Sequence, residues 1–218
     1  AAFEGYVARR ERGEPVAYGG AWIFGPRAAF GMNIFEPFRG GESGTMMAQV
    51  LRCYRQRFGV TTFQVDAHQF GLDNPDGIAS GAYWFYYRHG FRSIDARVAQ
   101  LAKAEKARLD AKPGSRSSDK TLLAFTESDV ALDLDGEGRA PPPRPDDVIA
   151  KVTRWIAHQH RGDRAAAERA AIDALTQATG VKVEDAHTRR VALEWGPVAA
   201  ACAIDNAETW ALIAQALR

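Results

Sequence analysis

The sequence predicts an α/β protein in which a mixed, mostly antiparallel sheet with flanking helices is followed by a small all-α bundle. Three observations lead to this prediction. Short β-rich runs separated by turn residues fill the first 35 positions, a glycine-rich turn joins a strand to an amphipathic helix at 28–60, and alanine-rich helical patterns fill 146–218. The chain has 218 residues, 46% of them hydrophobic, which is enough for a main domain and a smaller one.

Three strands are expected before the glycine-rich turn. Residues 3–8 have an alternating pattern, residues 16–24 form a second β-rich run, and residues 28–35 form a third. A polar turn around Gly13 and the pair Gly25-Pro26 separate the three runs. Because strands joined by short turns pair antiparallel, we expect an antiparallel meander.

The segment 28–60 reads as a strand, a glycine-rich loop and a helix. Its apolar run ends at Phe35, the loop occupies residues 39–44, and a helix should begin between Ser43 and Thr45, where apolar side chains start to recur at helical spacing. Backbone amides in such a loop point outward, and the helix dipole adds positive potential. The loop is therefore expected to favour a phosphate-bearing ligand.

The next part of the chain alternates between short β-rich and helical patterns. Residues 61–65 should lie parallel to the third strand, because a strand–helix–strand crossover returns in the same direction. Residues 77–91 are dense in aromatic side chains and read as a helix that ends at Gly90. A short strand at 91–94 and a helix over 95–111 are expected to follow.

Two interpretations of residues 121–134 stay open. Residues 130–134 are β-rich and can return a last strand to the sheet. Leu122, Leu123 and Phe125 can equally form a helical turn.

The composition changes near residue 136, which divides the chain into two expected domains. Residues 1–135 form the sheet domain, and residues 136–145 combine glycine, charge and proline as a linker does. Residues 146–218 read as a bundle of four helices, the third of which is interrupted at Gly196-Pro197. The expected core of the bundle consists of Trp155, Ile156, Ile172, Leu175, Leu193, Trp210, Ile213 and Leu217.

Composition excludes several classes of function. The net charge of +1 gives no broad footprint for nucleic acid, and no apolar run reaches the roughly 20 residues of a membrane span. Cys53 and Cys202 read as reduced thiols of a cytoplasmic protein. The chain begins without Met, which is expected of a processed protein or of a fragment of a longer one.

The order of these elements resembles the GNAT superfamily of acyl-CoA-dependent N-acyltransferases. The family signature for pyrophosphate binding, [Q/R]-x-x-G-x-[G/A], is matched in residues 39–44 at Arg39 and Gly44, whereas Glu42 replaces the middle glycine. A second signature, tyrosine followed four residues later by Gly-Phe, is matched by Tyr86 and the pair Gly90-Phe91. The resemblance covers residues 1–95 and leaves the family's first strand and its next two helices without a counterpart.

The resemblance implies a site for acetyl-CoA or another acyl-CoA between the third strand and the strand at 61–65. It implies that Ile34 and Phe35 offer backbone groups to the pantetheine arm and that Tyr86 protonates the departing thiolate. The residues that it assigns to the pyrophosphate are Arg39, Gly40, Gly41, Ser43, Gly44 and Thr45.

The general base stays open between Asp66 and His68, which follow the strand at 61–65. No metal site is expected, since His158 and His160 are two residues apart and lie on different faces of a helix.

Two functions follow from the resemblance. The first is transfer of an acyl group, most simply acetyl, from acyl-CoA to an amine of unspecified identity by direct attack. The alternative is a catalytically inactive module of the same fold that serves protein–protein association, which the missing base and Glu42 favour. The C-terminal helices are expected to cover the first domain, to form a homodimer or to bind a protein partner.

Overall fold

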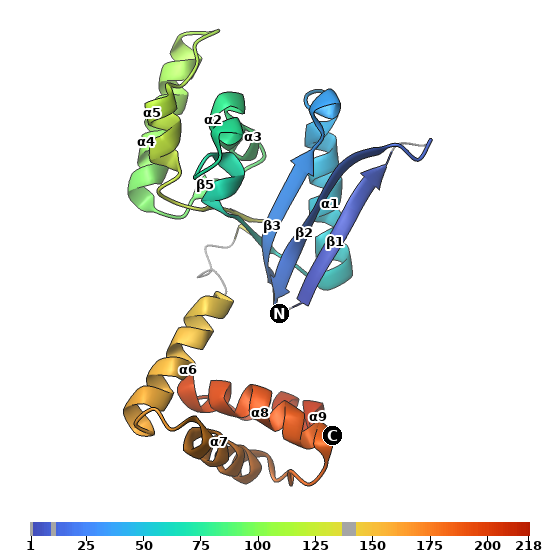
Figure 1. Cartoon of the computed structure of the whole chain (residues 1–218), viewed down its shortest axis with the longest axis vertical. Coiled ribbons are helices and arrows are strands. Elements are labelled where there is room, and N and C mark those ends of the chain that lie inside the picture. The colour runs from blue at the N-terminus through green and yellow to red at the C-terminus, as the bar shows by residue number, and fades with distance from the viewer. Residues whose placement is uncertain (1, 10–11, 137–142) are drawn as a thin grey trace. The chain divides into compact units, whose positions relative to one another are not determined.

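The computed structural model describes residues 2–9, 12–136 and 143–218. It divides into two compact units, Ala1–Pro142 and Pro143–Arg218, and each is described by itself (Figure 1). Most of the expected linker at 136–145 falls on residues 137–142, which lie outside the described residues.

The first unit is built on a mixed six-stranded sheet, as predicted. Its strands are β1 (Ala2–Arg9), β2 (Pro15–Phe24), β3 (Arg27–Ile34), β4 (Thr62–Val65), β5 (Arg92–Ser93) and β6 (Val130–Asp133). They lie in the order β1-β2-β3-β4-β6-β5. The β3–β4 pair is parallel and the other pairs are antiparallel, which confirms both the meander and the parallel return after the glycine-rich loop.

Helices of two lengths surround this sheet. The α-helices are α1 (Ser43–Phe58), α2 (Pro75–Ser80), α3 (Ala82–Arg88), α4 (Ala96–Ala111) and α5 (Asp119–Phe125), and short 3₁₀ turns cover η1 (Glu36–Phe38) and η2 (Ala67–Phe70). Both interpretations of residues 121–134 are correct, because α5 and β6 each use part of that segment. α1 begins at Ser43 and ends against Gly59, within the predicted limits.

The prediction of a single helix over 77–91 is wrong. The structure divides the segment into α2 and α3 at Gly81, whose φ of 65° is left-handed. Glycine adopts this conformation without the penalty that a Cβ would add, so the chain turns there and restarts. The break lets Tyr83 and Tyr86 of α3 enter the core.

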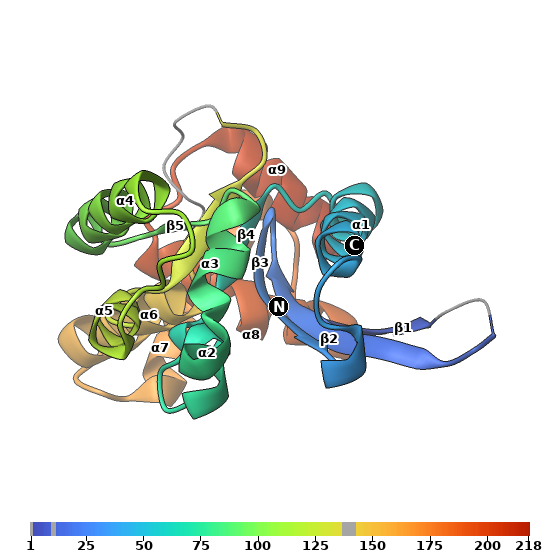
Figure 2. The same ribbon diagram turned by 90° about the horizontal axis from the view of Figure 1, so that it is seen from above.

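The core of the first unit lies under one face of the sheet. Phe30 of β3 and Phe63 of β4 both contact the ring of Tyr54 on α1, with centroids 6.2 Å and 6.3 Å apart. Met47 and Leu51 of α1 are buried in the same cluster. In Figure 2 the ribbon of β3 is seen between α1 and α3. Aromatic rings and aliphatic side chains therefore fill the space between α1 and strands β3 and β4.

The second unit contains helices α6 (Pro145–Gln159), α7 (Arg164–Thr179), α8 (Ala186–Ala201) and α9 (Ala207–Ala216). The predicted interruption at Gly196-Pro197 is wrong, because α8 continues through Pro197 to Ala201. A Cβ on Gly196 would lie 3.3 Å from the Cβ and carbonyl oxygen of Ala171. α8 therefore packs closely on α7 at this point, and that packing offsets the hydrogen bond that proline removes.

The core of the second unit differs in part from the prediction. Leu175, Ile213 and Leu217 are buried as expected, and Ile172 and Trp210 pack against them. Leu193 is exposed instead. Trp155 and Ile156 of α6 are half-buried and lie outside the buried cluster.

No helix in the described ranges is long and apolar enough to cross a membrane. Cys53 is exposed and Cys202 half-buried, and both are free thiols.

Candidate functional site

The first feature of the site is the separation of β3 from β4. The two strands pair only between Arg27–Ala29 and Thr62–Gln64, yet β3 continues to Ile34. β4 ends at Val65, where the chain turns into η2. Beyond Ala29, β3 therefore has no hydrogen-bonded partner in β4. We call this unpaired stretch of β3, together with the turn that follows β4, the splay.

The glycine-rich loop follows β3 after the short 3₁₀ turn η1. Gly40 has a φ of 117°, and a Cβ on Gly40 or Gly41 would meet no atom within 4 Å, so the loop faces open space. Ser43 closes the loop, because its amide and its hydroxyl both donate to the carbonyl of Gly40 at 2.8 Å and 2.6 Å. The amides that follow, at Gly44 and Thr45, belong to the first turn of α1, where no intrahelical acceptor exists. The loop thus presents amides at the positive end of a helix dipole.

The backbone groups expected to hold a pantetheine arm are engaged within the protein. The amide of Phe35 donates to the carbonyl of Val16 at 3.0 Å, and its carbonyl accepts from the amide of Phe38 at 2.8 Å. The guanidinium of Arg39 donates through Nε to the carbonyl of Ile34 at 3.0 Å. Arg39 therefore fixes the end of β3, a role that the sequence pattern did not predict.

The structure gives a steric reason for a glycine at position 44. A Cβ at this position would lie 3.0 Å from Nε2 of His89, the residue that caps the C-terminal end of α3. The other ring nitrogen, Nδ1, is 2.7 Å from the carbonyl of Phe85 and must carry the proton of that hydrogen bond. Nε2 of His89 thus stands against the start of α1, and the two helix ends meet beside the loop. No sequence motif assigns a role to His89.

Tyr86 lies in the core of the first unit. It is 3% exposed and packs against the rings of Phe70 and Phe91, with centroids 6.2 Å and 5.6 Å apart. Burial raises the pKa of the Tyr86 phenol well above its ordinary value. The side chain therefore keeps its proton at neutral pH.

A second phenol, that of Tyr6, lies near Tyr86, and a third, that of Tyr54, lies near Tyr6. Burial raises the pKa of Tyr6, and the neighbouring phenols of Tyr54 and Tyr86 raise it further. The hydroxyl of Tyr54 donates to the carbonyl of Glu4 at 2.6 Å. The hydroxyl of Tyr6 is buried without a hydrogen-bond partner among the described residues. Strand β1 and helix α1 thus add two tyrosines to this region that no local pattern connected with Tyr86.

Asp66 and His68 hold the turn that follows β4, and both are exposed. The carboxylate of Asp66 accepts from the amide of His68 at 2.8 Å and caps η2. Nδ1 of His68 is 2.8 Å from the carbonyl of Leu72, so Nδ1 carries a proton and Nε2 holds the lone pair. Both residues have structural roles at the open end of the splay, and His68 retains one nitrogen that can accept a proton.

Gln69 is a further residue of the splay that sequence reasoning missed. A Cβ on Gly31 of β3 would lie 3.5 Å from the amide group of Gln69. The side chain therefore reaches from the turn after β4 to the unpaired part of β3. Only the strand register brings these two residues together, so no sequence signal could have identified the pair.

The face of β1–β3 that points away from α1 carries exposed apolar side chains. Phe3 lies opposite Trp22 in the strand register, and Val7 lies opposite Tyr18, so all four share this face. Phe3 is 55% exposed and Trp22 is 58% exposed, and their ring centroids are 5.1 Å apart. Apolar patches of this kind often mark binding surfaces.

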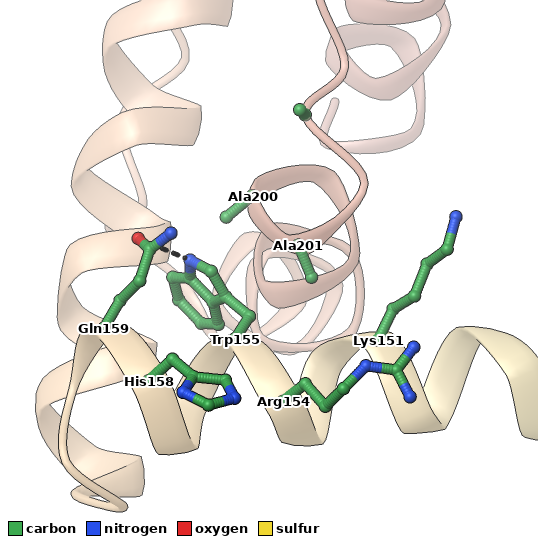
Figure 3. A pocket seen from close by; sticks show the side chains of 8 residues that line it. Lys151, Arg154, Trp155, His158, Gln159, Ala200 and Ala201 are labelled. Carbon is green, nitrogen blue, oxygen red and sulfur yellow. Dashed lines mark hydrogen bonds between the residues drawn. The ribbon is translucent and has the colours of Figure 1, made fainter.

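Two hollows lie elsewhere. One, of about 390 Å³, is bounded by β1 and by Val50, Cys53 and Arg57 of α1. The other, of about 430 Å³, lies within the second unit between α6 and the end of α8 (Figure 3). Within the part of the chain that the structure describes, no three His, Cys, Asp or Glu side chains are grouped as a metal site requires.

Comparisons with known proteins add little to this geometry. No family model and no curated protein matches the chain. Among solved structures, the chain is similar to one named "putative phosphinothricin N-acetyltransferase", with 19% sequence identity and a TM-score of 0.35 over 60% of this chain and 70% of that chain. A similarity at this level assigns neither an activity nor site residues.

Proposed function

We propose that the first unit is an acyl-CoA-dependent N-acyltransferase of the GNAT kind. The observation that carries the proposal is the splay of β3 from β4, with the glycine-rich loop and the start of α1 at its open end. Tyr86 is a buried phenol that packs on Phe70 of η2, in the turn that follows β4. A second, separate support is the match of Arg39 and Gly44 to the signature of the loop.

The loop fits the pyrophosphate of an acyl-CoA. Gly40 and Gly41 leave open space where side chains would otherwise stand, and the first-turn amides of α1 are donors for an anion. Nε2 of His89, beside Gly44, is a further polar group at this position. The amides assigned to the phosphates are those of Gly41, Gly44 and Thr45, whereas the amide of Ser43 is already bonded to Gly40.

The reaction is a direct transfer. The nitrogen of a neutral amine attacks the carbonyl carbon of the thioester, a C–N bond forms, and the C–S bond breaks with its electron pair on sulfur. Tyr86 supplies a proton to the sulfur, because its raised pKa keeps the phenol protonated until a strong base forms beside it. The proton lost by the amine goes to Nε2 of His68 or to the carboxylate of Asp66, and from there the tyrosinate is reprotonated through solvent.

The second candidate function is protein association without catalysis. The exposed face with Phe3, Val7, Tyr18 and Trp22 favours it, since such a patch is suited to a protein partner. Glu42 favours it too, because a carboxylate at the N-cap of α1 places negative charge beside an anion site. The acceptor amine and the acyl chain remain unassigned under the first candidate.

Calorimetric titration of acetyl-CoA into the wild type and into the variants Glu42→Gln and Glu36→Gln separates the two functions. At about 6 Å and an effective dielectric of about 20 to 80, one carboxylate repels one phosphate charge by roughly 1–3 kcal/mol. Glu42→Gln is therefore expected to tighten binding by about tenfold. Glu36→Gln is the matched control, since it removes a carboxylate from η1 before the loop, and it should change the affinity much less.

Each result decides between the candidates. Binding by the wild type supports the acyltransferase, and a gain in Glu42→Gln alone identifies the loop as the phosphate site. Equal affinity in all three proteins means that the Glu42 side chain points away from the ligand. If none of them binds acetyl-CoA, the acyltransferase proposal is wrong and association is favoured.

A further inference from the structure

The hollow of the second unit has a distinct chemical character. It is formed by α6 and by the C-terminal end of α8, and its volume is about 430 Å³. Figure 3 shows Trp155 extending from α6 toward Ala200 and Ala201 of α8, with Lys151 and Arg154 on one side of the indole in this view. The hollow thus has an aromatic wall, an alanine floor and a basic rim. It belongs to neither function proposed above.

The basic rim has no acidic partners among the residues that the structure describes. Lys151 and Arg154 are exposed one helical turn apart, and no carboxylate there lies within 4.0 Å of either. Some other cations of the unit are paired, such as Arg164 with Glu168 at 2.9 Å and Arg190 with Glu194 at 3.2 Å. His158 lines the same hollow.

These cations are not needed to cap α8. The amide of Cys202 donates to the carbonyl of Val198 at 2.9 Å, and the amide of Ile204 donates to that of Ala199 at 3.2 Å. The amide of Ala203 donates to the carbonyl of Ala200 at 3.3 Å. The turn after α8 therefore supplies donors to these three carbonyls, which do not require the positive charge of the rim.

Trp155 offers its ring to a ligand. Its indole N–H already donates to Oε1 of Gln159 at 3.1 Å, and the ring of His160 lies against it with centroids 4.6 Å apart. A second planar group is suited to the part of the indole that faces the hollow. Because Ala200 and Ala201 have small side chains, the space opposite the indole stays open.

We propose that this hollow binds a planar aromatic ligand that carries a phosphate, the class to which mononucleotides belong. The ring packs against Trp155 and the alanine floor, and the phosphate accepts from Arg154 and Lys151. The volume is in the range of about 300–1,000 Å³ that small-molecule sites occupy, which is more than a free phosphate requires.

The test is calorimetric titration of AMP, adenosine and inorganic phosphate into the full chain at low salt. AMP is expected to bind more tightly than either fragment, and its affinity should fall as salt is added. Arg154→Gln and Lys151→Gln should each weaken AMP binding by about three- to fivefold, because each removes one exposed charge contact. Arg190→Gln, which removes a paired arginine from α8, should leave the affinity unchanged.

The variants also identify the unit that binds, which matters because CoA itself contains an adenosine phosphate. A loss in Arg154→Gln with no loss in Arg39→Gln places AMP in the second unit. No binding of AMP, binding no tighter than that of inorganic phosphate, or equal affinity in Arg154→Gln and the wild type overturns the proposal. Circular dichroism of each variant confirms that the helices are retained, so a loss of affinity is not a loss of fold.

Discussion

The two units are built from different side chains. All 11 phenylalanines and all 6 tyrosines of the chain precede residue 126, whereas the second unit has neither residue type. The first unit buries rings such as Phe63, Tyr83 and Phe125 beneath its sheet. The second unit brings its helices together through small residues, among them Ala171 and Gly196.

This difference has a chemical consequence. A ring buries more apolar area than an alanine, so a sheet gains stability from aromatic side chains that pack beneath it. Close helix packing through alanine needs no large side chains, but it buries less area per residue. Only the first unit has phenols in its core, and the proposed acyltransferase site lies in that unit.

The largest expected effect tests whether the two cores are independent. Phe125→Ala should cost the first unit about 3–5 kcal/mol, and Leu175→Ala should cost the second about 2–5 kcal/mol, since both side chains are fully buried. Scanning calorimetry of each variant should show one transition lowered and the other unchanged. A common shift of both transitions would mean that the cores unfold as one.

Local patterns predicted most of the elements in both units. The strands, the start of α1 at Ser43 and the helices of the second unit follow from alternation, capping residues and turn residues. The break at Gly81 was missed because a glycine permits a left-handed turn without requiring one. The continuation of α8 through Pro197 was missed because it depends on packing against Ala171, which is distant in the sequence. A window of neighbouring residues contains no information on such contacts.

The candidate site was predicted less completely than the fold. The loop and Tyr86 were identified from motifs that lie in one stretch of sequence. His89 and Gln69 were not, because each meets its glycine only through the pairing of separate elements. Tyr6 is 80 residues from Tyr86, and only the sheet and α3 together bring the two phenols close.

Alkaline pH should lower the stability of the first unit more than that of the second. Burial raises the pKa of Tyr6, Tyr54, Tyr83 and Tyr86 above the ordinary value of 10.0, and no tyrosine is present in the second unit. The unfolded chain loses these protons first, so their contribution is fully present below about pH 10 and is lost as pH rises toward the folded-state values. One fully buried phenol such as Tyr86 contributes at most about 1.4 kcal/mol per pH unit in that window.

The measurement is the temperature of each calorimetric transition between pH 8 and pH 11, with tyrosinate absorbance recorded in parallel. The transition of the first unit should fall above pH 10 together with the appearance of tyrosinate, and Tyr86→Phe should reduce the slope. An equal fall in both transitions would show that groups other than these phenols control alkaline stability.

The smallest expected effect compares helix caps in the two units. Asp95 accepts from the amides of Arg97 and Val98 at 2.8 Å and 3.0 Å at the start of α4, and Asp163 accepts from the amide of Ala166 at 2.9 Å at the start of α7. Replacing either aspartate by alanine should lower the free energy of unfolding by about 1 kcal/mol, because at least one backbone amide of the first helical turn loses its hydrogen-bond acceptor. The free-energy effects are therefore similar in the two units.

The temperature shifts should nevertheless differ, because the entropy of unfolding grows with the number of residues that unfold. The second unit is about half as long as the first. Asp163→Ala should lower its transition by about 4–8 °C, and Asp95→Ala should lower the transition of the first unit by about half as much. Asn is nearly as good an N-cap as Asp, so Asp95→Asn and Asp163→Asn are the matched controls and should shift neither transition by more than about 1–2 °C. Equal shifts in the two alanine variants would contradict separate unfolding and would instead require one cooperative unit that contains both helices.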